Sequence, residues 1–217
     1  MGRPGALLFD FNGTLSDDEP LVCRLFVELF AELGRPLSSD EYFERFAGHT
    51  DAEIVRSWLG PDFPDVDAIV DERIARYLTV AADGSTVPEA VREAVLYAAE
   101  RAPVAVVSSA ARAEIETVLE GAGLAGAIRA VVSIDDVSIA KPAAEPYERA
   151  LDLLDRPEDA VAFEDTEVGV ASALAAGLRC IAVLGTMGAE RLRAAESVVP
   201  ELEPVIVREV LGLPPGA

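Results

Sequence analysis

The first third of the chain changes from a strand-like pattern to a helical one. Residues 6–9 are continuously apolar and end at Asp10, a pattern typical of a buried strand in a parallel sheet. Over residues 21–33 the apolar side chains recur every three or four positions, which predicts an amphipathic helix ended by Gly34 and Pro36. Further helical stretches are predicted over about residues 38–46, 51–59 and 66–80, and no strand is predicted between residues 16 and 85.

The pattern changes again after the turn-rich residues 82–85. From there on, helical stretches alternate with short apolar runs, which is typical of a parallel sheet covered by helices on both faces. We therefore expect an α/β fold with a Rossmann-like parallel sheet. The predicted helices cover residues 88–101, 111–122, 144–154 and 167–176, and the predicted strands cover residues 104–107, 130–133, 160–163 and 179–183.

Composition narrows the classes of partner. The 217 residues carry 18 basic and 39 acidic side chains, for a formal charge of −21, and this excess of negative charge disfavours nucleic acid and anionic membrane surfaces as partners. No apolar run is long enough to cross a bilayer and no secretory signal is evident, so we expect a cytoplasmic protein. Cys23 and Cys180 fall in apolar stretches and are predicted to be buried free thiols.

Chemically active side chains follow four of the predicted strands. Because ligands bind beyond the carboxyl ends of strands in such sheets, these residues are expected to meet at one edge. Asp10 can act as a carboxylate nucleophile. Together with Glu164 and Asp165 it forms an all-oxygen site of the kind that Mg²⁺ prefers.

The other strand ends supply groups that bind a phosphoryl group. Lys141 is the single lysine among 18 basic residues, and it offers a compact positive charge to Asp10 and to the phosphoryl oxygens. Ser108, next to Ser109, can donate a hydrogen bond to a phosphoryl oxygen. The backbone N–H groups that follow Asp10, at Gly13 and Thr14, can surround the remaining oxygens.

These four stretches resemble the signature motifs of the haloacid dehalogenase superfamily. The matching segments are Asp10-Phe11-Asn12-Gly13-Thr14-Leu15, Val106-Val107-Ser108, Lys141-Pro142, and Phe163-Glu164-Asp165-Thr166 through Gly169. Their order, with a helical insert after the first motif, resembles the phosphatase and phosphoglucomutase branch. The resemblance implies a core of residues 1–15 and 86–217 and a helical cap of residues 16–85 that closes over the site.

The resemblance also implies a reaction. We expect Mg²⁺-dependent hydrolysis of a small phosphorylated metabolite, a phosphate monoester, through an aspartyl-phosphate on Asp10. Asp10, Asn12, Lys141, Glu164 and Asp165 are the expected catalytic and metal-binding residues, with Asn12 offering its backbone carbonyl to the metal. Gly13, Thr14, Ser108, Ser109, Lys141 and the cap residue His49 are the expected residues for binding phosphate or substrate.

Asn12 departs from the family pattern. Family phosphatases carry an aspartate there, which protonates the leaving alcohol and activates water, and an amide cannot exchange a proton at pH 7. Such acid–base help contributes roughly 10²–10⁴ in rate. Four interpretations stay open: His49, Asp17 or Asp18 supplies the proton; the enzyme is slow and needs good leaving groups; the protein only binds a phosphate ligand or has a regulatory role; or the asparagine is an engineered change.

Three related activities fit the sequence less well. Haloacid dehalogenases work without metal, which disagrees with the presence of Glu164 and Asp165. The phosphonate-cleaving branch needs a cap lysine, and residues 16–85 contain none. A phosphomutase needs the aspartate that Asn12 replaces.

Overall fold

A six-stranded parallel sheet forms the centre of the molecule. The computed structural model describes residues 4–214, and the strand order across the sheet is β3-β2-β1-β4-β5-β6. All five neighbouring pairs are parallel, so every strand ends at the same edge. The strands are β1 (Leu7–Phe9), β2 (Val104–Val107), β3 (Ala130–Val132), β4 (Val161–Glu164), β5 (Arg179–Val183) and β6 (Ser197–Val199). The predicted α/β fold with a Rossmann-like sheet is confirmed.

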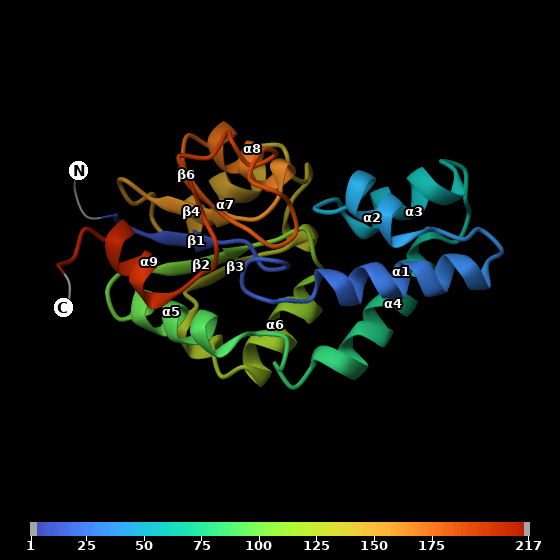
Figure 1. The fold of residues 1–217 in the computed structure, drawn as a ribbon, viewed down its shortest axis with the longest axis horizontal. Coiled ribbons are helices and arrows are strands. Elements are labelled where there is room, and N and C mark those ends of the chain that lie inside the picture. The colour runs from blue at the N-terminus through green and yellow to red at the C-terminus, as the bar shows by residue number, and fades with distance from the viewer. Residues whose placement is uncertain (1–3, 215–217) are drawn as a thin grey trace.

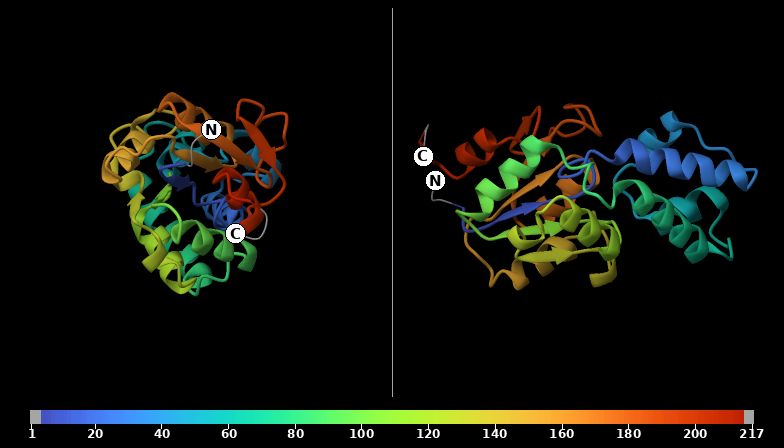
Figure 2. Two further views of the ribbon diagram at one scale, coloured as in Figure 1. Left: turned by 90° about the vertical axis from the view of Figure 1, so that its left-hand side faces the viewer. Right: turned by 90° about the horizontal axis from the view of Figure 1, so that it is seen from below.

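Helices cover both faces of this sheet and extend beyond its carboxyl edge. In Figure 1, α7 and α8 lie above the sheet and α5, α6 and α9 lie below it, while α1–α4 stand apart to the right. The right-hand view of Figure 2 shows that α1–α4 continue past the ends of the strands. The helices are α1 (Glu19–Glu32), α2 (Ser39–Arg45), α3 (Asp51–Leu59), α4 (Val66–Ala81), α5 (Glu89–Ala99), α6 (Arg112–Gly121), α7 (Glu145–Leu153), α8 (Glu167–Ala175) and α9 (Pro204–Val210), with 3₁₀ turns at Ala125–Ala127 and Ile134–Asp136.

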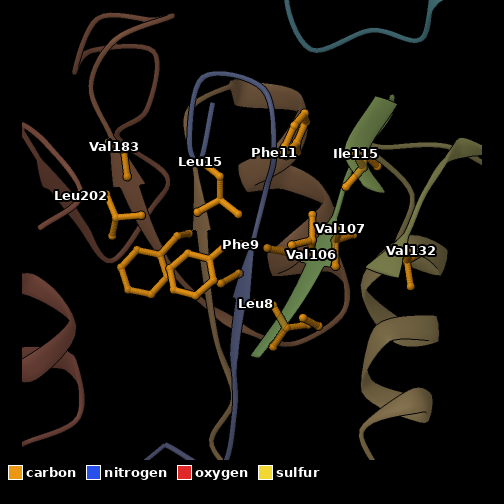
Figure 3. Close-up of a cluster of buried hydrophobic side chains, with 14 of the residues drawn as sticks. Leu8, Phe9, Phe11, Leu15, Val106, Val107, Ile115, Val132, Val183 and Leu202 are labelled. Carbon is orange, nitrogen blue, oxygen red and sulfur yellow. The ribbon is translucent and has the colours of Figure 1, made fainter. Parts of the chain in front are cut away.

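The central strands are apolar except for Glu164 at the end of β4, because both of their faces are covered. Every residue of β1, β2 and β4 is buried. Figure 3 shows Leu8 and Phe9 of β1 pointing to opposite sides of the strand, among side chains from the neighbouring elements. The Phe9 ring stacks on Phe163 of β4, with centroids 4.8 Å apart. Each such burial contributes about 1.5–3 kcal/mol, so these strands fix the position of the sheet edge firmly.

Helices α2 and α3 start at residues whose side chains cap them. Ser38 caps α2 and Thr50 caps α3, each in a reciprocal capping box with the glutamate three residues later. Helix α1 packs against α4 and α2. Its side chains Phe26 and Phe30 are fully buried on the apolar face that the three- and four-residue spacing predicts. Both cysteines are buried and free, as expected.

Two C-terminal elements were not predicted. Strand β6 is three residues long and only partly buried at the sheet edge, so it has no long apolar run. Helix α9 is seven residues long and begins at Pro204. Both exist because they dock on larger neighbours, β6 on β5 and α9 on α5.

The division into a core and a cap stays a prediction. Residues 1–3 and 215–217, which the predicted core includes, lie outside the described residues. Within residues 4–214, no helix is both long enough and apolar enough to cross a membrane.

Candidate active site

Asp10 lies at the carboxyl end of β1, in a tight loop that packs on the end of β4. The backbone N–H groups of Leu15 and Ser16 both donate to the carbonyl of Phe11, at 2.9 Å each. Gly13 has a φ of +78°, and a Cβ there would stand 1.9 Å from Oδ2 of Asp165. Only glycine therefore combines this backbone conformation with such a close approach to Asp165.

Lys141 joins the ends of three strands. Its Nζ donates to Oδ1 of Asp10 at 2.6 Å, to Oε1 of Glu164 at 2.6 Å and to the carbonyl of Val107 at 2.9 Å. The lysine is 5% exposed. Burial alone would lower its pKa, but the carboxylates of Asp10 and Glu164 raise it above the usual range, so Lys141 stays charged.

Asp10, Glu164 and Asp165 form a compact acidic cluster. One oxygen from each lies within 4.8 Å of the others. Oε2 of Glu164 and Oδ2 of Asp165 are buried without a partner in hydrogen-bond geometry among the described residues, although the Thr186 hydroxyl lies near Asp165. Burial, together with the charge of Asp10, raises the pKa of Asp165 well above its usual value and that of Glu164 to about 7.

This cluster fits a hard divalent cation. Three buried carboxylates face one lysine, so their negative charge is only partly neutralised. A bound cation would supply the missing positive charge and would give the unpartnered oxygens a ligand. The expected metal-binding carboxylates thus lie together, while the role of the Asn12 backbone carbonyl stays a prediction.

The Asn12 side chain is held by Asp18. Its Nδ2 donates to both carboxylate oxygens of Asp18, at 3.1 Å each, and its Oδ1 lies 3.5 Å from the Ser108 hydroxyl. Tyr77 of α4 donates a short hydrogen bond to Asp18. Burial raises the pKa of Asp18 to about 6, against the opposing hydrogen bonds from Tyr77 and Asn12. Asp17, in contrast, is exposed.

The expected phosphate-binding residues divide into two groups. Ser108 and Ser109 line the same cavity as Asp10, and the Ser109 hydroxyl is buried without a hydrogen-bond partner among the described residues. Gly13 and Thr14 instead line a different pocket, together with residues at the start of α5 and after β5. The Thr14 hydroxyl lies 3.3 Å from Oδ1 of Asp165 and donates a hydrogen bond to it. Thr14 therefore supports the acidic cluster.

The cavity over Asp10, called here the Asp10 cavity, lies between the sheet edge and α1–α4. The centres of water molecules can occupy about 40 Å³ of its interior, which is room for a few waters. His49 lines it, half-exposed, with Nδ1 3.7 Å from Oε2 of Glu53. The lining includes Asp10, Asn12, Ser108, Ser109 and Lys141 from the sheet side and Glu19, Tyr42, His49, Asp51 and Arg73 from the helical side.

Four residues of the helical wall with polar or charged side chains were not predicted as site residues: Glu19, Tyr42, Asp51 and Arg73. Arg73 stands on the apolar face of α4, one turn before the buried Tyr77. A charged residue at a helical position predicted to be buried is a signal that sequence analysis could have used. No comparable signal marks Glu19 or Asp51, because each opens a helix, where acidic residues are common for other reasons.

Comparison with known proteins places these observations in context. The family model described as haloacid dehalogenase-like hydrolase matches residues 7–183. The chain is 32% identical over 219 residues to the protein SUPPRESSOR OF QUENCHING 1, chloroplastic, of Arabidopsis thaliana, covering 97% of this chain but only 20% of that protein. It is 30% identical over 208 residues to validoxylamine A 7'-phosphate phosphatase of Streptomyces hygroscopicus subsp. limoneus, covering 91% of this chain and 94% of that enzyme.

A solved structure shares the whole architecture. A mutant of CbbY from Rhodobacter sphaeroides in complex with xylulose-(1,5)bisphosphate matches with a TM-score of 0.82 and 28% identity. The match covers 92% of this chain and 95% of that chain.

Proposed function

This chain belongs to the haloacid dehalogenase-like hydrolase family, and from that premise we propose that it is a Mg²⁺-dependent phosphatase of small phosphate monoesters. The resemblance carried by the four motifs is confirmed as far as the family. Relatives named for a phosphatase activity and for a complex with a sugar bisphosphate support a phosphorylated small molecule as the substrate.

One observation carries the proposal. The Asp10 carboxylate lies in the Asp10 cavity, with the charged Lys141 at 2.6 Å and the acidic cluster beside it. A buried carboxylate fits a nucleophilic role when a fixed cation can hold the phosphoryl group next to it. Ser108 and Ser109 line the same side of the cavity, where they can donate to the phosphoryl oxygens.

Mg²⁺ fits the carboxylates of Asp10, Glu164 and Asp165, with the Asn12 carbonyl as a further ligand. When bound, the ion supplies positive charge that offsets the charge of the phosphoryl group. The two unpartnered carboxylate oxygens are the observation that supports this choice.

The reaction proceeds by two displacements at phosphorus. An oxygen of Asp10 attacks phosphorus, the bond from phosphorus to the alcohol oxygen breaks, that oxygen takes up a proton from water, and an acyl phosphate forms on Asp10. Water then attacks that phosphorus, which releases inorganic phosphate and restores the Asp10 carboxylate. Lys141 stays charged throughout, hydrogen-bonded to Asp10, and its positive charge attracts the phosphoryl oxygens.

Asn12 limits the rate of both displacements. It stands where a proton is needed for the departing oxygen, and an amide can donate a hydrogen bond but no proton. We therefore propose that the enzyme is slow on ordinary alkyl esters and faster on esters with acidic leaving groups.

Residues 16–85 are proposed to act as a cap. The Asp10 cavity admits only a few waters as it stands, so a substrate enters after α1–α4 move away from the sheet edge. Closure then removes bulk water from the site.

Hydrolysis of p-nitrophenyl phosphate with Mg²⁺ tests this function. We expect turnover by the unmodified protein, loss of at least 10³-fold in Asp10→Asn, and little change in Asp152→Asn, an exposed aspartate on α7. Turnover that survives Asp10→Asn contradicts the mechanism. Mg²⁺ should also raise the Tm of the unmodified protein and of Asp152→Asn, but not that of Asp165→Asn.

A binding protein without turnover is the second candidate. It is favoured by the way Asp18 and Tyr77 fix Asn12 in a position where it can hold, but not protonate, a ligand. Binding of inorganic phosphate without hydrolysis of any ester would support this candidate.

A further inference from the structure

The positive charges around the Asp10 cavity are already engaged by the protein itself. Among the described residues that line it, three side chains can carry positive charge: His49, Arg73 and Lys141. A second anionic group on a substrate, such as another phosphate or a carboxylate, needs a cation beyond the one that holds the reacting phosphoryl group. The state of each of these three side chains therefore bears on the charge of the substrate.

Arg73 is the cation on the helical wall, and two carboxylates hold its guanidinium. Its Nε donates to Oδ2 of Asp51 at 2.8 Å, and one terminal nitrogen donates to Oε2 of Glu114 at 2.8 Å. Shorter contacts join the guanidinium to both carboxylates a second time. Asp51 begins α3 and Glu114 lies on α6, so the planar fork of Arg73 is engaged from two sides.

Lys141 is fully engaged as well, and His49 lies next to a carboxylate where the cavity meets solvent. Lys141 makes its three hydrogen bonds to Asp10, Glu164 and the Val107 carbonyl, which uses all of its N–H donors. Nδ1 of His49 lies 3.7 Å from Oε2 of Glu53, and 41% of the histidine side chain is exposed to solvent.

Carboxylates exceed cations on the helical wall. Asp51 lines the cavity there, Glu114 pairs with Arg73 and Glu53 lies beside His49, while the protonated carboxyl group of Glu19 adds a neutral hydrogen-bonding group. A second anion would have to separate Arg73 from its carboxylates, leaving those charges buried and unpaired. A hydroxyl group can instead bond to the free carboxylate lone pairs, and an ammonium group also gains attraction to them.

Given the proposed function, we propose that the substrate carries no anionic group besides the phosphoryl group. It is a phosphate monoester of a neutral or amine-bearing polyol, and the Asp10 cavity rejects bisphosphates and phosphorylated acids.

Three substrates of nearly equal size test this charge selection: phosphoethanolamine, 2-hydroxyethyl phosphate and phosphoglycolate, which end in an ammonium, a hydroxyl and a carboxylate. We expect kcat/KM with Mg²⁺ to be at least tenfold lower for phosphoglycolate than for the other two. Binding of the same three compounds to Asp10→Asn, measured by calorimetry, should follow the same order without any contribution from bond cleavage.

A matched pair of variants tests the cause. Asp51→Asn frees part of the Arg73 guanidinium, so the disadvantage of phosphoglycolate should shrink by at least threefold. Glu32→Gln removes one negative charge from an exposed ion pair with Arg76 on the same group of helices, and it should leave the ratio unchanged.

Two outcomes overturn the inference while leaving the proposed function intact: phosphoglycolate hydrolysed as well as 2-hydroxyethyl phosphate, or a bisphosphate such as fructose 1,6-bisphosphate preferred over fructose 1-phosphate. Failure of every ester, p-nitrophenyl phosphate included, contradicts the proposed function instead. The order of binding to Asp10→Asn then decides the charge selection by itself.

Discussion

At the scale of single residues, Asn12 and Asp18 form one unit. The two Asp18 oxygens accept from the Asn12 amide at 3.1 Å each, and Tyr77 donates to the same carboxylate. A carboxylate at position 12 would therefore stand against a buried carboxylate at position 18, and the two would repel each other or share a proton. The asparagine is matched to its neighbour, which a comparison of single positions would miss.

This pairing predicts that restoring an aspartate at position 12 is not enough. Asn12→Asp alone should lower the Tm and give little gain in activity. The double change Asn12→Asp with Asp18→Asn keeps one amide and one carboxylate in contact, so it should recover the Tm and raise kcat by roughly 10²-fold or more. Unfolding scans and phosphate release from an alkyl ester measure both effects. A single Asn12→Asp protein as active and as stable as the double variant would contradict the pairing.

Glu19 is a buried acid that the proposed chemistry does not use. It is 7% exposed and accepts a hydrogen bond of 3.0 Å from Tyr42. Burial and the neighbouring Asp18 raise its pKa to about 8, although the Tyr42 hydrogen bond opposes this. Between its ordinary pKa near 4.5 and about 8, the folded protein keeps a proton that the unfolded chain has released.

The proton kept by Glu19 determines whether the free energy of unfolding rises or falls with pH. Because the unfolded state binds fewer protons in this window, the free energy of unfolding should fall as pH rises from about 5 to about 8. Glu19→Gln is neutral at every pH, so it should become more stable than the unmodified protein toward pH 8, by a few kcal/mol at about 1.4 kcal/mol per unit of pKa. Denaturant unfolding in EDTA at several pH values measures this. A constant difference across the range would show that Glu19 does not titrate in this way.

At the scale of elements, α4 is the helix that ties α1–α4 to the rest of the molecule. One face of it carries Arg73, which reaches Glu114 of α6, and Tyr77, which reaches Asp18 beside the loop that follows Asp10. Burial alone would lower the pKa of Arg73, but its two carboxylate partners raise it, so the guanidinium stays charged. Any outward motion of α4 must therefore break buried polar contacts at two points.

Two glutamates of α6 allow the buried ion pair with Arg73 to be compared with an ion pair on the surface. Glu114 is 1% exposed and pairs with Arg73, whereas Glu116 is exposed and pairs with Arg112. Glu114→Gln should cost about 3–5 kcal/mol of unfolding free energy, because it leaves a buried charge underpaired. Glu116→Gln should cost less than about 1 kcal/mol. Urea unfolding of the two variants measures the difference, and equal costs would place the Arg73 contact among the weak surface pairs.

At the scale of the whole molecule, the charge of −21 opposes every anionic substrate. Association then works against a long-range repulsion, and salt should weaken that repulsion. The screening length falls from about 30 Å at 0.01 M to about 8 Å at 0.15 M salt.

We therefore expect kcat/KM to rise severalfold over this range, with kcat nearly unchanged. The rise should be larger for phosphoglycolate than for phosphoethanolamine, because phosphoglycolate carries more negative charge. Steady-state kinetics at the two salt concentrations measure the effect. A fall in kcat/KM would indicate that local attraction at the site outweighs the repulsion.

The sequence by itself determined the architecture and the side chains that meet at the edge of the sheet. Apolar runs of strand length, alternating with helical periodicity, predicted five of the six strands and eight of the nine described helices, because buried strands and amphipathic helices write their environment into local patterns. The rule that parallel strands end at one edge then brought Asp10, Lys141, Glu164 and Asp165 together, and their contacts are those of one site. β6 and α9 were missed because their stability comes from docking on β5 and α5.

Only the tertiary structure decided how those groups are surrounded. The contact of Asn12 with Asp18 joins residues six positions apart in the sequence. The contact of Arg73 with Glu114 joins residues 41 positions apart, on two different helices. The helical periodicity marks Arg73 as buried but does not identify its partner, and no local pattern joins Asn12 to Asp18, because such contacts depend on how elements pack in three dimensions. The same is true of the ion pairs that Arg73 and Lys141 form at the Asp10 cavity, on which the proposed charge of the substrate depends. The sequence states how many charged residues the protein has, but only the tertiary structure shows which of them are paired.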